Sequence, residues 1–197
     1  MSDNSRHQER QQKLKEKVDA RVEDAQQERG IVIVITGNGK GKSTSGFGTI
    51  ARAVGHDQKC GVAQFIKGTW ACGERDLLEQ HDVDFHVMAT GFTWDTQDKT
   101  ADTVAAIAVW KEAKKMLADD RYDVVLLDEM TYMIAYDYLP LDEVIEAIQN
   151  RPAEQTVVIT GRAAHRSLIE MADTVSEVRN VKHAFDSGIK ARRGVDW

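Results

Sequence analysis

Short apolar runs alternate with stretches of helical spacing along most of this chain. Each run is too short for a helix of its own and predicts a buried strand. The runs lie at 31–35, 60–66, 84–89, 122–129, 155–160 and 174–178. Helical spacing occurs between them, at 45–54, 74–80, 102–118, 140–148 and in a short segment that ends near residue 171. Strands that alternate with helices indicate a mostly parallel sheet with helices on both faces, which is an α/β fold.

Residues 1–29 differ from the rest and predict a polar helical arm in front of one domain at 30–197. Seven Lys or Arg residues in the arm balance seven Asp or Glu residues. Its apolar residues form one narrow helical stripe, made of Leu14, Val18, Val22 and Ala25. A face this narrow is too small to dock firmly by itself. The segment is therefore either a solvated arm or an arm that becomes ordered against a partner subunit or a ligand.

Composition and charge narrow the class of protein. The 197 residues include 42% hydrophobic and 29% charged residues, which is typical of a soluble globular domain. The net charge of -6 argues against a dedicated nucleic-acid-binding protein, which would present a basic face. No apolar run approaches the length of a membrane span, and the first residues lack the apolar core of a signal peptide. We therefore predict a cytoplasmic chain with no nucleic-acid or membrane partner.

The first strand is followed at once by a glycine-rich loop that predicts a phosphate-binding site. Strand, glycine-rich turn and helix N-terminus together direct backbone N–H groups and the positive end of a helix dipole at one point. Lys42 can reach the terminal phosphates, and the Ser43 hydroxyl can ligate Mg²⁺. The candidate binding residues are Thr36, Gly37, Asn38, Gly39, Lys40, Gly41, Lys42, Ser43 and Thr44. The usual pattern has glycine at the position of Thr36, so a turn that only packs a helix on a sheet is the alternative.

Further polar residues follow the ends of two other predicted strands. Asp128 and Glu129 end the run at 122–129, at the sheet edge where ligands bind in open α/β folds. Either carboxylate could hold Mg²⁺ opposite Ser43, the alternative being an acid that caps a helix. Arg162 follows the run at 155–160 and could bind phosphate oxygens bidentately through two guanidinium N–H groups. Arg52, about two turns into the helix after the loop, either reaches a ligand or faces water.

Motifs along nearly the whole chain resemble the ATP:corrinoid adenosyltransferase family of the CobA/BtuR type. They are Thr36-Gly-Asn-Gly-Lys-Gly-Lys42, Gln64-Phe-Ile-Lys-Gly-Thr-Trp70, Met88-Ala-Thr-Gly-Phe-Thr-Trp-Asp95, Leu127-Asp-Glu-Met-Thr-Tyr132, Tyr136-Asp-Tyr-Leu-Pro140, Thr160-Gly-Arg162 and Val181-Lys-His-Ala-Phe-Asp186. The threonine at position 36 is what this family has, whereas Ser43 replaces its usual threonine and keeps the hydroxyl. The resemblance implies a single P-loop NTPase-like domain of the RecA-like kind, preceded by the arm.

The activity that the resemblance implies is transfer of the 5′-deoxyadenosyl group of ATP to the Co(I) of a reduced corrinoid, in cobalamin biosynthesis and salvage. The products are adenosylcobalamin, adenosylcobyrate or adenosylcobinamide, together with triphosphate. Lys40, Lys42, Arg162 and Mg²⁺ would stabilise the departing triphosphate. The resemblance favours Glu129 over Asp128 as the metal ligand.

The family also implies roles for two aromatic residues and for partners. Phe92 and Trp94 match positions that close the lower axial face of the corrinoid, which makes Co(II) easier to reduce; ordinary packing is the alternative. The family is homodimeric, with an N-terminal helix that can cover the nucleotide and corrinoid site. An electron donor such as a flavodoxin-like reductase is a further expected partner.

Two other classes of function remain open from the sequence. A P-loop ATPase or small-molecule kinase would use the same loop, with Glu129 orienting water, and would release ADP. A non-catalytic nucleotide-binding or nucleic-acid-associated module would bind without turnover. Adenosyl transfer differs from both because it yields intact triphosphate.

Overall fold

The chain folds around a parallel β-sheet, which confirms the predicted α/β fold. The computed structural model describes residues 3–66, 71–88 and 98–197. Over these residues the sheet has six strands, all parallel, in the order β3-β2-β4-β5-β1-β6. The strands are β1 (Val32–Thr36), β2 (Cys60–Gln64), β3 (Asp84–Val87), β4 (Val124–Asp128), β5 (Thr156–Thr160) and β6 (Thr174–Glu177). Because all strands run the same way, their carboxyl ends meet at one edge of the sheet.

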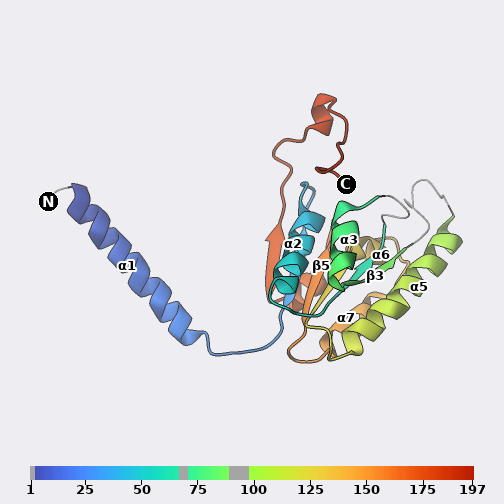
Figure 1. The fold of residues 1–197 in the computed structure, drawn as a ribbon, viewed down its shortest axis with the longest axis horizontal. Helices are drawn as coiled ribbons and strands as arrows, with labels where there is room; N and C mark the ends of the chain where they lie inside the picture. Colours follow the sequence, from blue (N-terminus) through green and yellow to red (C-terminus); the bar gives the residue numbers. More distant parts are fainter. Residues whose placement is uncertain (1–2, 67–70, 89–97) are drawn as a thin grey trace.

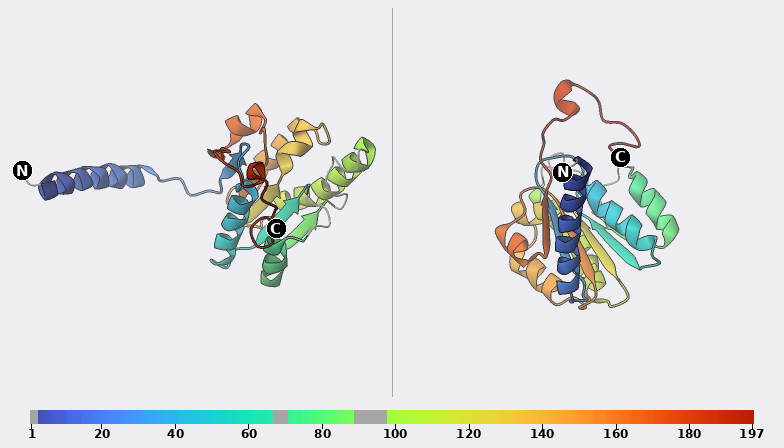
Figure 2. Two further views of the ribbon diagram at one scale, coloured as in Figure 1. Left: turned by 90° about the horizontal axis from the view of Figure 1, so that it is seen from above. Right: turned by 90° about the vertical axis from the view of Figure 1, so that its left-hand side faces the viewer.

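Helices cover both faces of the sheet, as the alternating side chains of β4 require. Val125 and Leu127 pack in one buried cluster with side chains of α5 (Lys99–Ala118), α6 (Met130–Ala135), α7 (Leu141–Gln149) and α8 (Arg166–Met171). Val124 and Leu126 pack in the other cluster, with side chains of α2 (Lys42–Val54) and α3 (Gly73–Leu78). A strand with both faces buried reads as a continuous apolar run, which is why β4 shows no polar alternation. Figure 2 shows the two helical layers on either side of the sheet.

The starts of α2 and α5 differ from the sequence-based expectation, and one short helix was not expected. α2 begins at Lys42 instead of residue 45, because Gly41 adopts a left-handed conformation that starts the helix inside the loop. α5 begins at Lys99 instead of residue 102, because the Asp98 carboxylate accepts hydrogen bonds from the first backbone N–H groups. The six-residue helix α6 was not predicted, since one and a half turns carry too little periodicity.

The N-terminal segment forms α1 (Asp3–Asp24), which extends away from the sheet (Figure 1). The sequence predicted a polar helical arm over residues 1–29, and the helix ends at Asp24, before the end of that segment. Leu14, Val18 and Val22, the apolar stripe, are 56%, 48% and 66% exposed. No helix among the described residues is long and apolar enough to cross a membrane.

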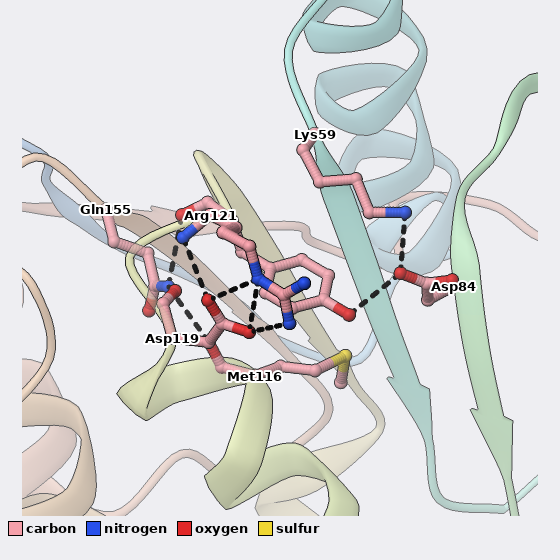
Figure 3. A network of polar contacts seen from close by, with 7 residues as sticks. Lys59, Asp84, Met116, Asp119, Arg121 and Gln155 are labelled. Carbon is pink, nitrogen blue, oxygen red and sulfur yellow. Dashed lines mark hydrogen bonds and ion pairs between the residues drawn. The ribbon is translucent and has the colours of Figure 1, made fainter.

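At the amino edge of the sheet, buried Gln155 joins three chain segments (Figure 3). Its Nε2 donates to the backbone carbonyl oxygens of Met116, Asp119 and Tyr122, at 3.0, 3.1 and 3.1 Å. The Tyr122 hydroxyl in turn donates to Asp84 at the start of β3, at 2.8 Å. The side chain of Gln155 therefore ties the end of α5 to the starts of β4 and β5.

We expect Gln155→Leu to lower the free energy of unfolding by about 2 kcal/mol, because three carbonyl oxygens lose a buried amide donor and the bond to the Met116 oxygen is itself buried. Urea unfolding followed by circular dichroism measures the change. Arg121→Gln is the control, since it breaks an ion pair with Asp119 in which the Arg121 side chain is 81% exposed. An equal loss of stability in both variants would show that the buried amide has no special role.

Candidate active site

The phosphate loop lies between β1 and α2, against the chain that leaves β6. The Gly39 N–H donates to the carbonyl oxygen of Val178 at 2.7 Å. A Cβ at Gly37 would lie 2.5 Å from that same oxygen, and a Cβ at Gly39 would lie 2.6 Å from the carbonyl oxygen of Arg179. Side chains at these two positions would therefore collide with backbone. Gly37 and Gly41 also have positive φ, at 99° and 117°, which glycine adopts without strain.

Thr36 occupies a position where the general phosphate-loop pattern has glycine, and the structure gives a reason. Its side chain is buried, and its hydroxyl accepts a hydrogen bond from the backbone N–H of Ala164, at 3.2 Å. Glycine would leave that N–H without this partner. Thr36 therefore fixes the loop after β5 against the end of β1.

Lys42 is a buried cation beside the loop. Its side chain is only 6% exposed, and its Nζ donates to the carbonyl oxygen of Gly39 at 2.8 Å. Burial lowers the pKa of Lys42, an effect that nearby Glu129 opposes and nearby Arg162 reinforces. A partly desolvated ammonium gains most from an anionic ligand, so this side chain is suited to bind phosphate.

A pocket of about 460 Å³ brings most of the predicted site residues together. Its lining includes Asn38, Gly39, Lys40, Gly41, Lys42, Ser43 and Thr44 of the loop and first helical turn, with Glu129 and Arg162 from the ends of two other strands. Backbone amides, two lysines and one arginine thus surround the same space. This arrangement is suited to bind a polyphosphate.

The adjacent acids Asp128 and Glu129 lie in different surroundings. The sequence alone did not show which of the two faces the pocket. Asp128 is fully buried: its Oδ2 accepts from Gln64 Nε2 at 3.1 Å, and its Oδ1 accepts from the Thr160 hydroxyl at 2.7 Å. The described pocket lining includes Glu129 but not Asp128. Glu129 also has the left-handed backbone conformation, with φ at 60°, which is rare outside glycine and recurs at functional sites.

Other predicted residues lie elsewhere. Arg52 is exposed in the last turn of α2 and is not among the described residues that line the pocket. Thr36, the last residue of β1, and Gly37, which follows it, also lie outside that lining. Phe92 and Trp94 fall outside the residues that the structure describes.

The C-terminal segment also lines the pocket, a role that its family motif at 181–186 was not assigned from sequence. The chain leaves β6 at the carboxyl edge of the sheet and folds back beside it (Figure 1). This segment supplies the pocket residues Asn180, His183, Phe185, Asp186, Val195 and Asp196, and α3 supplies Glu74. Asp196 forms an ion pair with Lys40 of the loop at 2.6 Å. A parallel last strand must release the chain at the ligand edge, and this was the available signal.

The polar residues of the pocket fit Mg²⁺ bound together with phosphates better than they fit a metal ion whose ligands all come from the protein. Among the described residues, no group of three or more His, Cys, Asp or Glu side chains could hold a metal ion. Ser43 and Glu129 line the same pocket and offer a hydroxyl and a carboxylate oxygen. Mg²⁺ typically takes one or two protein oxygens of this kind and completes its shell with phosphates and water.

Comparisons with known proteins agree with one another over the whole chain. A family model described as ATP:corrinoid adenosyltransferase BtuR/CobO/CobP matches residues 28–197, and one described as Cob(I)alamin adenosyltransferase N terminal matches residues 1–22. The chain is 66% identical to the corrinoid adenosyltransferase of Escherichia coli (strain K12) over 197 residues, which is 100% of both chains. It is 65% identical to the corrinoid adenosyltransferase CobA of Salmonella typhimurium, again over 100% of both chains. The corrinoid adenosyltransferase of Pseudomonas aeruginosa is 50% identical over 194 residues, 98% of this chain and 96% of the relative.

Proposed function

The chain belongs to the ATP:corrinoid adenosyltransferase family, and from that premise we propose that it transfers the 5′-deoxyadenosyl group of ATP to the Co(I) of a reduced corrinoid, releasing triphosphate. The observation that carries the proposal is the pocket in which the glycine-rich loop, buried Lys42, Arg162 and Glu129 meet. A site built this way holds a triphosphate at one end and leaves the nucleoside free to meet a second substrate.

For this reaction the protein must position the two substrates and stabilise the charge of the leaving group, and no proton transfer is needed. Co(I) of the corrinoid substrate donates an electron pair to C5′ of the ribose, and the C5′–O bond breaks with its electrons going to the triphosphate. The chain must hold C5′ in line with the cobalt and stabilise the leaving group. Lys42 and the loop amides supply that stabilisation, and Lys40 joins them by exchanging Asp196 for phosphate oxygens.

Mg²⁺ would be held by Ser43 and Glu129, together with the phosphates. When bound, the ion neutralises charge on the triphosphate oxygens. Glu129 contributes a fixed carboxylate at the pocket wall, and Ser43 contributes its hydroxyl at the N-terminus of α2.

The function is tested by incubating the protein with ATP, Mg²⁺ and chemically reduced cobalamin. We expect a light-sensitive Co–C product and one equivalent of inorganic triphosphate. ADP or orthophosphate without alkylated cobalt would point instead to an ATPase or kinase. Binding without turnover would point to a non-catalytic nucleotide-binding module.

We further propose that Phe92 and Trp94, which lie outside the described residues, close the lower axial face of the corrinoid. Replacing both by alanine should slow turnover more when the reaction starts from Co(II) with a reductant than when Co(I) is supplied. The reason is that loss of the axial ligand eases reduction, whereas the Co(I) nucleophile needs no such help. Equal rate losses in the two assays would contradict this role.

The N-terminal arm, residues 1–29, is proposed to cover the nucleotide and corrinoid site within a homodimer, and residues 30–197 to form the catalytic domain. The exposed apolar stripe of α1 supports this proposal, because Leu14, Val18 and Val22 would be buried by a second surface. A flavodoxin-like reductase is the proposed electron donor, and the cytoplasm the proposed location.

A further inference from the structure

Two buried threonines connect the residues that carry opposite charges at the pocket wall. Glu129 follows β4 and Arg162 follows β5, so the two lie at the ends of neighbouring strands. Thr160, the last residue of β5, is fully buried, and its hydroxyl accepts the N–H of Glu129 at 2.9 Å. Thr131, in the first turn of α6, donates its hydroxyl to the carbonyl oxygen of Arg162 at 2.6 Å. Each threonine therefore holds the backbone of the charged residue on the other strand.

The hydroxyl of Thr160 is oriented by Asp128. It donates its hydrogen to Asp128 Oδ1 at 2.7 Å, which leaves a lone pair for the N–H of Glu129. Asp128 is fixed in turn by Gln64, whose Nε2 donates to the other carboxylate oxygen at 3.1 Å. Asp128, Gln64 and Thr160 are all fully buried, so water cannot replace these bonds. The chain of bonds runs from β2 through β4 and β5 to the backbone of Glu129.

Glu129 needs such support because its backbone is strained. Its φ of 60° and ψ of 21° place a residue with a Cβ in the left-handed region, which persists only where the surroundings hold it. Close packing adds to the constraint: a Cβ at Gly161 would overlap the hydroxyl of Thr131, so the residue after β5 packs directly against the side chain of Thr131 in the first turn of α6. The direction in which Glu129 leaves β4 is therefore set by its neighbours.

We propose that Thr160 is a positioning residue that, oriented by Asp128, aims the Glu129 carboxylate at the divalent cation of the bound nucleotide. The inference rests on the proposed role of Glu129 in holding that cation. It assigns Asp128 a purpose other than ligation, since both of its oxygens accept hydrogen bonds inside the protein. It also gives the buried hydroxyl of Thr160 a part in cation binding that packing alone would not provide.

The test compares Thr160→Val, which keeps the shape and removes the hydroxyl, with Thr160→Ser, which keeps the hydroxyl. Binding of Mn²⁺ to the protein in the presence of ATP and without corrinoid is measured by electron paramagnetic resonance. We expect Thr160→Val to weaken Mn²⁺ binding about tenfold, in the range found when groups that orient a metal ligand are removed. Thr160→Ser should bind Mn²⁺ nearly as the unmodified chain does.

Thr156→Val is the matched control, because it removes a hydroxyl from the same strand at the opposite edge of the sheet, where it accepts the N–H of Ile31. It should leave Mn²⁺ binding unchanged. In the Glu129→Gln background, Thr160→Val should cause no further loss, because both changes act on one interaction. If the valine variant does not fold, Thr160→Cys makes the same comparison, since a thiol is only a weak acceptor.

The outcomes separate the inference from the function on which it rests. Unchanged Mn²⁺ binding in folded Thr160→Val would overturn the positioning role if Glu129→Gln weakens binding. Unchanged binding in Glu129→Gln would show that the proposed cation role of Glu129 itself is wrong. Equal weakening by the valine and serine variants would show that volume at position 160, and not its hydroxyl, is what matters.

Discussion

Replacing Lys42 by alanine should abolish ATP binding in the working concentration range and lower kcat/KM by about 10³-fold or more. Loss of a single preorganised group that stabilises developing charge typically costs about 10²–10³-fold, and here the same group also binds the ground-state triphosphate. Lys42 is the most buried cation of the pocket, and so it gives the strongest electrostatic contribution there. ATP binding by calorimetry and adenosylation rates measure the two effects.

The control for this variant is Lys115→Ala, which removes an exposed lysine paired with Glu112 on α5. It should leave both ATP binding and turnover unchanged. Near-normal turnover in Lys42→Ala would refute the assignment of the loop as the triphosphate site, because no other buried lysine is found among the described pocket residues.

Burial of Lys42 also predicts a pH dependence. Desolvation lowers the pKa of this ammonium in the free protein, and a bound triphosphate raises the pKa again by stabilising the charged form. Linkage then requires the affinity for ATP to be highest below the lowered pKa of Lys42 in the free protein. The affinity falls as the pH rises through that pKa. The dissociation constant for ATP, measured at increasingly alkaline pH, checks the sign.

The parts of the molecule that could be predicted from sequence are those set by neighbours along the chain. The strands at 31–35 and 155–160 are apolar runs bounded by turns, and the phosphate loop is one continuous motif. The family motifs also allowed the activity to be predicted from sequence. Local pattern was also enough to place Arg162 at the ligand edge, because the carboxyl end of every parallel strand lies there.

The parts that escaped prediction depend on contacts between distant residues. Nothing in the pair Asp128-Glu129 says which side chain is buried; the bonds of Asp128 to Gln64 and Thr160 decide it, over 64 and 32 residues of sequence. The ion pair between Lys40 and Asp196 likewise joins opposite ends of the domain. For the C-terminal tail, the exit from the last parallel strand indicates only the ligand edge, and its lack of periodicity does not say which loop residue it will contact.

Glu129→Gln is the substitution that separates the two acids most sharply. The amide keeps the size of the side chain and removes the charge, so we expect turnover to fall about 10²-fold with little change in the free energy of unfolding. Half-maximal rate should also require more Mg²⁺, because a carboxylate ligand is replaced by a weaker oxygen donor. Initial rates over a range of Mg²⁺ concentrations, together with urea unfolding of the same samples, measure both quantities.

The comparison variant is Asp128→Asn, in which stability is the discriminating quantity. An amide at position 128 turns one buried acceptor into a donor that faces either Gln64 Nε2 or the Thr160 hydroxyl, both of which already donate there. Burying such mismatched donors should cost about 1–3 kcal/mol of unfolding free energy. Asp128→Asn should therefore lose stability as well as activity, whereas Glu129→Gln loses activity alone. If Glu129→Gln proved the less stable variant and Asp128→Asn kept full stability but needed more Mg²⁺, the roles assigned to the two carboxylates would have to be exchanged.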